Sequence, residues 1–208
     1  MTGALLPLSF CLNMCYDTLA DLSRTGIPMA KIMRRTAWLA AVVTLVCAIL
    51  YLNTGNGVAL TLAITFGTVS YHFVMRLIVG TVVNRLLGNR VDYRRRWFRV
   101  SAVEQKLYTR IKVKQWKGKM ATYDPKCFDP GIHTWDEIAQ AMCQAELVHE
   151  IIIPLSFIPI LASVPFGAVF VFVITSVLAA CYDAMFVIMQ RYNRPRILKL
   201  IEKTKTHH

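Results

Sequence analysis

Charged residues are scarce in this chain, and acidic residues are the scarcest. Only 17% of the 208 residues are Asp, Glu, Lys or Arg, whereas 55% are hydrophobic, and the mean hydropathy is +0.44. A soluble globule of this length needs more polar surface, so the sequence predicts an integral membrane protein. The net charge of +12 accompanies apolar runs, so anionic lipid or an anionic cosubstrate fits it better than nucleic acid.

Several familiar motifs are missing as well. The chain has no Gly-rich phosphate loop, no dinucleotide fingerprint and no GxSxG nucleophile elbow, so a serine acyl-enzyme is unsupported and no tightly bound cofactor is expected. The six cysteines include no CxxC pair, which favours free thiols. No basic stretch precedes the apolar run from Leu5 to Leu12, which argues against a cleaved signal peptide and for a surface helix.

Basic residues are concentrated in one block between apolar runs. From Asn84 to Lys119 they face only two acids, Asp92 and Glu104. Such loops stay on the cytoplasmic side of a membrane, and a second basic stretch follows residue 190. We therefore expect a multi-pass protein of the cell membrane with both termini in the cytoplasm. The block contains Arg85, Arg90, Arg94, Arg95, Arg96, Arg99, Lys106, Arg110, Lys112, Lys114, Lys117 and Lys119.

Four apolar runs are candidates for membrane spans, at residues 38–52, 58–83, 151–164 and 165–189. The turns at 53–57 and 163–167 carry no charge, so two helical hairpins satisfy the positive-inside rule. The predicted fold is all-α: a polytopic membrane helix bundle of about four transmembrane helices, an amphipathic N-terminal helix and a cytoplasmic basic loop. We treat it as one membrane domain with an N-terminal segment (1–36), a first hairpin (37–83), a basic loop (84–145), a second hairpin (146–192) and a basic tail (193–208).

Local signals place the third helix. Thr134 followed by Glu137 resembles a capping box, so a helix is expected to begin there and to enter the membrane through Glu146 and His149. Pro154 and Pro159 predict a kink or break, because each removes a backbone donor.

Glu146 and His149 are separated by three residues and share one helical face. A carboxylate beside an imidazole is a general-base pair. The structural alternative is that Glu146 only satisfies a buried histidine or a basic residue from the loop. Glu-x-x-His also occurs in di-iron bundles, but those need two copies and this chain has one, so no metal is expected.

His72 and Arg76 lie four residues apart in the second apolar run and are expected to face the bundle interior. Arg76 would contact an oxyanion or a headgroup, and His72 would donate or accept a hydrogen bond. The alternative is that Arg76 extends to the cytosolic interface, which its position two turns from the basic loop favours.

Three sequence segments carry a family resemblance: Trp97-Phe98 followed by KQWKGK over residues 114–119, AELVH over 145–149, and QRYNRPR over 190–196. Together they resemble the glycosyl-4,4'-diaponeurosporenoate acyltransferase family, over roughly Tyr93 to Leu200. That resemblance implies a membrane enzyme that esterifies a sugar hydroxyl of a glycosylated carotenoid with a fatty acyl chain. It singles out Trp116, Lys117, Lys119, Glu146, His149, Arg191, Asn193, Arg194 and Arg196.

The predicted activity is fatty acyl transfer from a cytosolic thioester to a hydroxyl of a membrane glycolipid or glycosylated carotenoid. The donor would be acyl-coenzyme A or an acyl carrier protein, and the membrane lipid is the other partner. His149 is the expected base, oriented by Glu146, with Arg194, Asn193 or Arg76 as oxyanion donors. The remaining candidates, which would bind substrate, are His72, Trp116, Lys117, Lys119, Arg191 and Arg196.

Two other functions stay open at this stage. One is a membrane scaffold whose basic loop binds anionic lipid, and the other is a small membrane methyltransferase or reductase. The tail also has two interpretations. Pro195 is expected to end the last span, and the arginines around it form either a stop-transfer anchor or a substrate-contacting turn folded back against Glu146 and His149.

Overall fold

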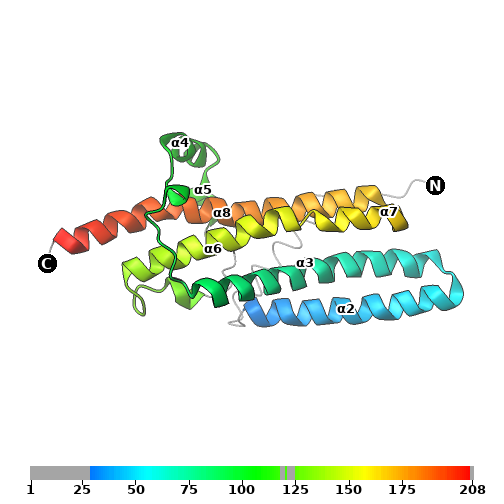
Figure 1. The fold of residues 1–208 in the computed structure, drawn as a ribbon. Helices are drawn as coiled ribbons and strands as arrows, with labels where there is room; N and C mark the ends of the chain where they lie inside the picture. Colours follow the sequence, from blue (N-terminus) through cyan, green and yellow to red (C-terminus); the bar gives the residue numbers. More distant parts are fainter. Residues whose placement is uncertain (1–28, 118–119, 121–124, 207–208) are drawn as a thin grey trace.

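The computed structural model describes residues 29–117, 120 and 125–206, and within these ranges it is helical without a strand (Figure 1). The α-helices are α2 (Met29–Thr54), α3 (Gly57–Leu87), α4 (Ala102–Arg110), α5 (Val113–Trp116), α6 (Trp135–Leu155), α7 (Ser163–Phe166) and α8 (Val169–Thr206), and three 3₁₀ turns are η1 (Arg96–Phe98), η3 (Pro125–Phe128) and η4 (Ile158–Ala162).

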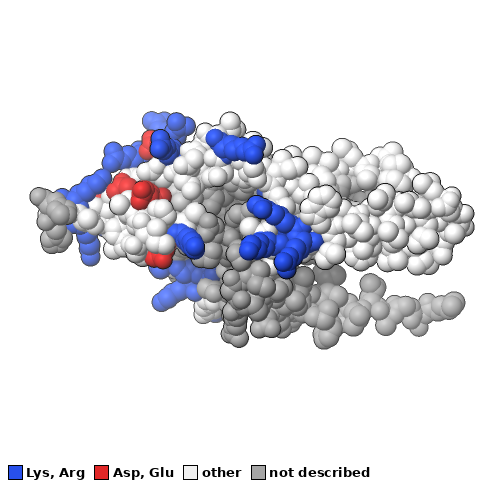
Figure 2. Space-filling view, turned by 90° about the horizontal axis from the view of Figure 1, so that it is seen from below, with Lys and Arg blue, Asp and Glu red and all other residues white. Residues whose placement is uncertain are grey.

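The long helices form two hairpins, as predicted. α2, α3, α8 and the stretch Trp135–Phe166 are each long and apolar enough to cross a membrane. Both turns, between α2 and α3 and between α7 and α8, lie at the same end of the bundle (Figure 1). Figure 2 shows Lys and Arg away from that end, which is white on the face in view. The all-α, four-span prediction is confirmed for the described residues.

The first hairpin is longer than expected. α2 already begins at Met29, so residues 29–36 belong to a span and not to a separate surface helix, while residues 1–28 of the expected amphipathic segment lie outside the described ranges. Small buried residues on both helices allow close packing, as is common between membrane helices; they are Ala37, Ala40 and Cys47 on α2 and Ala59 and Ala63 on α3.

The third helix begins and breaks as the sequence predicts. The Thr134 hydroxyl accepts the Glu137 amide, and the Glu137 carboxylate accepts the Thr134 amide, so the capping box is present. α6 ends one residue after Pro154, and η4 contains Pro159. Pro159 has no N–H for the Leu155 carbonyl, and the Tyr71 hydroxyl of α3 donates to that carbonyl instead at 2.8 Å.

The last helix does not end at Pro195, so this prediction is wrong. α8 continues through Pro195 to Thr206. A proline inside a helix costs about 3 kcal/mol. Arg191 and Arg194, just before Pro195, are held by ion pairs to the buried Glu146, and Ile201 is buried after it. Tertiary contacts therefore outweigh the local preference of Pro195, and no turn folds back.

The basic loop lies across α8. α4 and α5 sit on the side of α8 away from α3 (Figure 1). The loop is fixed by a small apolar cluster in which Val91, Phe98 and Cys143 are buried. This cluster packs the loop near Phe98 against α6, and Arg194 of α8 donates to the Phe98 carbonyl.

Candidate active site

His149 of α6 and Asp183 of α8 face each other between the two helices, and they are hydrogen-bonded. His149 Nδ1 lies 2.8 Å from Asp183 Oδ1. The Asp183 side chain is 1% exposed, whereas that of His149 is 21% exposed. The imidazole stacks on Phe186, with ring centroids 4.5 Å apart and planes inclined by 6°. The ring is therefore fixed in orientation while part of it stays accessible.

Arg76 from α3 completes this group. Its guanidinium donates to the other carboxylate oxygen of Asp183 and to the carbonyls of His72 at 3.0 Å and Ala179 at 3.4 Å. Arg76 thus faces the bundle interior, which was one of its two interpretations; extension to the cytosolic interface, which its position had favoured, does not describe it. Asp183 thus has one oxygen on Arg76 and the other on His149 Nδ1. In the tautomer that donates Nδ1–H to this carboxylate, Nε2 is the ring nitrogen with a lone pair.

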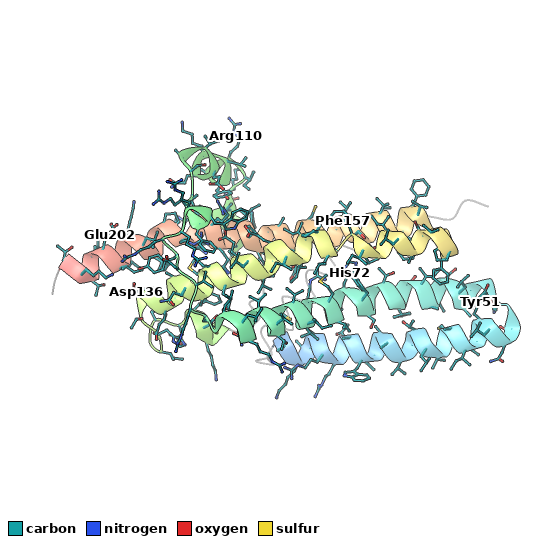
Figure 3. The ribbon with its side chains drawn as sticks, in the orientation of Figure 1. Tyr51, His72, Arg110, Asp136, Phe157 and Glu202 are labelled. Carbon is teal, nitrogen blue, oxygen red and sulfur yellow. The ribbon has the colours of Figure 1, made fainter. Side chains whose placement is uncertain are left out.

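His72 lies one turn before Arg76 on α3 and is buried, with 8% of its surface exposed. Within the described part of the chain neither ring nitrogen has a hydrogen-bond partner. A buried polar group without a partner costs about 1–3 kcal/mol. His72 is therefore a group for which a ligand hydroxyl or carbonyl would supply the missing partner, and Figure 3 shows it on the side of α3 that faces the second hairpin.

Glu146 does not orient His149. Its carboxylate is fully buried and pairs with two arginines of α8: Arg191 Nη1 donates to Oε1 at 2.7 Å, and Arg194 donates to Oε2. The expected Glu146–His149 pair is absent because α8 offers each residue a different partner. The structural alternative, in which Glu146 satisfies buried basic side chains, describes its position.

Arg191 and Arg194 are also tied to the basic loop. Arg194 donates to the Phe98 carbonyl at 2.7 Å, and Arg191 donates to the carbonyls of Trp97 and Arg99 and to Glu104. The Arg194 side chain is 1% exposed. Its terminal nitrogens are occupied by the Phe98 carbonyl and Glu146, so the geometry does not favour Arg194 as an oxyanion donor.

The electrostatics of Glu104 follow from this tie. Burial alone would raise the pKa of Glu104, but the capping hydrogen bonds from Ser101 and the positive Arg191 outweigh burial and hold that pKa below its usual value. Two acids, Glu104 and Glu146, thus compensate two arginines.

The remaining predicted residues lie in the basic loop and toward the C-terminal end of α8. Lys117 Nζ donates to Asn193 Oδ1 at 2.6 Å, and Arg196 donates to the Tyr192 hydroxyl at 2.8 Å. Asn193 follows Phe186 by seven residues, which is about 10 Å along the helix, too far to share an oxyanion with His149. Trp116 donates to the Ile111 carbonyl within its own loop at 3.2 Å. Lys119 lies outside the described residues.

The model of the glycosyl-4,4'-diaponeurosporenoate acyltransferase family matches residues 94–203. The chain belongs to this family. The match confirms the resemblance seen in the sequence, and it spans the basic loop, α6 and nearly all of α8, and hence His149 and Asp183. No curated protein and no solved structure matches the chain.

Family membership does not assign roles, and sequence reasoning had missed Asp183. A signal was available, because Asp183 is an ionisable residue in the middle of an apolar run, and such residues are functional by default. A metal site is not indicated by the geometry: within the described ranges no three His, Cys, Asp or Glu side chains gather closely enough to hold an ion.

Proposed function

We propose that this protein is an integral membrane acyltransferase that moves a fatty acyl group from a cytosolic thioester to a hydroxyl of a membrane glycolipid or glycosylated carotenoid. Membership of the acyltransferase family and the apolar helices support the reaction class. The single observation that carries the mechanism is the His149–Asp183 pair, with one ring nitrogen held and the other free.

His149 acts as the general base in this proposal. Nε2 takes the proton of the acceptor hydroxyl as its oxygen attacks the thioester carbonyl, and the imidazolium that forms is stabilised by Asp183. The tetrahedral intermediate then expels the thiolate as the carbon–sulfur bond breaks. The thiolate takes the proton from His149, so the enzyme returns to its starting state.

Arg76 and His72 support this chemistry in different ways. Arg76 is a positioning residue, because its donors hold Asp183 and the His72 backbone. His72 is assigned to hydrogen bonding with the reacting sugar hydroxyl or the oxyanion, because its ring nitrogens are unpaired in the described chain. Both side chains come from α3, outside the residues that the family match covers.

The test is transfer itself. Purified protein is incubated with palmitoyl-coenzyme A and a glucosylated carotenoid or a glucosyl diacylglycerol, and ester formation is measured against pH. We expect ester formation with at least one acceptor and a rate that rises through the pKa of a single group. We expect this pH-dependent rise in the rate to be absent in His149→Ala. Binding of anionic lipid without any transfer would favour the scaffold instead.

We also propose that the protein is a multi-pass protein of the cell membrane with both termini in the cytoplasm. The uncharged turns lie at one end of the bundle and the basic loop lies away from it, as retention of positive charge in the cytosol requires. An impermeant maleimide should label Asn53→Cys from outside intact cells and should label Lys199→Cys only after lysis. The reverse pattern would invert the topology.

A further inference from the structure

Two cations of the basic loop and the tail converge on one tyrosine. The Lys117 nitrogen lies 5.2 Å from the centroid of the Tyr192 ring, and the Arg196 guanidinium carbon lies 4.7 Å from the same centroid. Lys117 also donates to Asn193, and Arg196 donates to the Tyr192 hydroxyl. We call Lys117, Tyr192, Asn193 and Arg196 the Lys117–Arg196 cluster.

This cluster has no acidic counterpart in the described chain. Arg191 and Arg194, on the same helix, are each paired with a carboxylate, but no ion pair within the described ranges involves Lys117 or Arg196. Burial lowers the pKa of Lys117, and the neighbouring positive charges of Arg196 and Lys114 lower it further. An anion at this place would offset a repulsion that the described residues leave uncompensated.

One member of the cluster, Asn193, lies on the same face of α8 as Phe186 of the candidate active site. Phe186, which stacks on the His149 ring, precedes Asn193 by seven residues, or two turns, and Arg196 follows Asn193 by three. Ten residues of helix from Phe186 to Arg196 span about 15 Å. Lys117 and Arg196 therefore lie beside the Asn193 end of this face, and the His149 ring lies about 15 Å farther along α8.

We propose that the Lys117–Arg196 cluster binds the diphosphate of a coenzyme A thioester, and that the pantetheine arm lies along α8 from Asn193 toward Phe186 with the thioester at His149. The arm contains about a dozen single and amide bonds between phosphate and sulfur, which by backbone dimensions extend to about 15 Å. The arm thus matches the separation, and the acyl chain would enter the apolar part of the bundle. The position of the thioester rests on the proposed function, whereas the phosphate site does not.

Binding of free coenzyme A tests the phosphate site without any turnover. Titration calorimetry in phosphatidylcholine nanodiscs compares the parent with Lys117→Met/Arg196→Met and with the control Lys199→Met/Lys203→Met, which removes the same charge from exposed positions of α8. We expect at least a tenfold weaker Kd in the first variant, less than a twofold change in the control, and no difference for pantetheine, which lacks phosphate. Arg196→Gln, at an exposed side chain, should weaken Kd at least threefold and serves if the double variant does not fold.

Three results would overturn the proposal. The first is equal coenzyme A affinity in the parent and the cluster variants, and the second is an equal loss of affinity in the cluster and control variants. The third is a difference between parent and cluster variants that disappears when the nanodiscs contain phosphatidylglycerol. The last result would assign the cluster to a lipid headgroup. Failure of the proposed function appears elsewhere, as full transfer by His149→Ala. Loss of coenzyme A affinity in the cluster variants, together with an active His149→Ala, would keep the phosphate site and remove only the base.

Discussion

Glu146 and His149 lie one turn apart on α6, yet they belong to two networks of different character. Glu146 is fully buried, and its two oxygens are taken by Arg191 and Arg194, which also hold carbonyls of the basic loop. His149 has one nitrogen on Asp183, and its side chain stays 21% exposed. The Glu146 network therefore holds the basic loop against α6 and α8, whereas the His149 network leaves Nε2 of the imidazole without a partner in the proposed mechanism.

The difference shows how a short motif can mislead. Both residues are ionisable, both lie at the edge of a span, and both carry the i, i+3 spacing of a catalytic pair. What separates them is the partner helix: α8 presents arginines to Glu146 and an aspartate to His149. A buried charge with all its partners satisfied is a structural element, whereas a partly satisfied imidazole is a candidate for chemistry.

The largest effect that tests this contrast is expected from His149→Ala. Removal of the base should lower kcat by about 10²- to 10⁴-fold, while thermal unfolding of the variant in detergent stays near that of the parent. Asp183→Asn should also lower kcat, because an amide can stabilise the wrong imidazole tautomer. Rates come from ester formation at saturating donor. Near-parent activity of purified His149→Ala would show that His149 is not the base, and the two networks would then not differ in function.

The second network is tested by Glu146→Gln. Breaking a buried ion pair costs about 3–5 kcal/mol, so this variant should lose stability strongly and lose activity in proportion to unfolding. Its matched control is Glu150→Gln, which removes only the bond from Trp97 to a partly exposed carboxylate and should change stability by less than about 1 kcal/mol. A stable but inactive Glu146→Gln would return Glu146 to the mechanism.

Much of the fold was predictable because the signals were local or compositional. The capping box at Thr134, the break at Pro154 and Pro159, the uncharged turns and the apolar runs each act within a few residues. The continuation of α8 through Pro195 was not predictable, because it depends on ion pairs to Glu146, 48 residues away for Arg194.

The site was predictable only in part. His149 and the inward orientation of Arg76 followed from the rule that ionisable groups in spans avoid lipid. The partners of Glu146 and His149 could not be predicted from the sequence. They depend on the register between α6 and α8, two helices that are separated by the turn at Gly167. The same rule applies to Asp183, which is an ionisable residue in an apolar run as Arg76 is.

A smaller effect is expected from Arg194→Lys. Lysine keeps the charge beside Glu146 but cannot also reach the Phe98 carbonyl with the same planar fork. Loss of one hydrogen bond from a charged group should lower the free energy of unfolding by about 1.5–3 kcal/mol. Transfer measured on the folded fraction should be close to that of the parent, and Lys199→Ala should change neither quantity. Specific loss of kcat in stable Arg194→Lys would make Arg194 a substrate contact.

The smallest effect concerns Glu104, the exposed end of the closed network. Its pKa is lower in the folded protein than the ordinary value of 4.5, so the unfolded chain binds the proton more tightly. Its contribution to stability is therefore fully present above about pH 4.5 and is lost as the pH falls through the lower, folded pKa. Because the pair with Arg191 is open to solvent and screened by salt, the contribution should stay below about 1 kcal/mol.

Thermal melts between pH 7 and pH 3 should show a slightly steeper loss of stability for the parent than for Glu104→Gln, and the difference should shrink at high salt. Parallel curves for the two proteins would mean that Glu146 alone compensates both arginines.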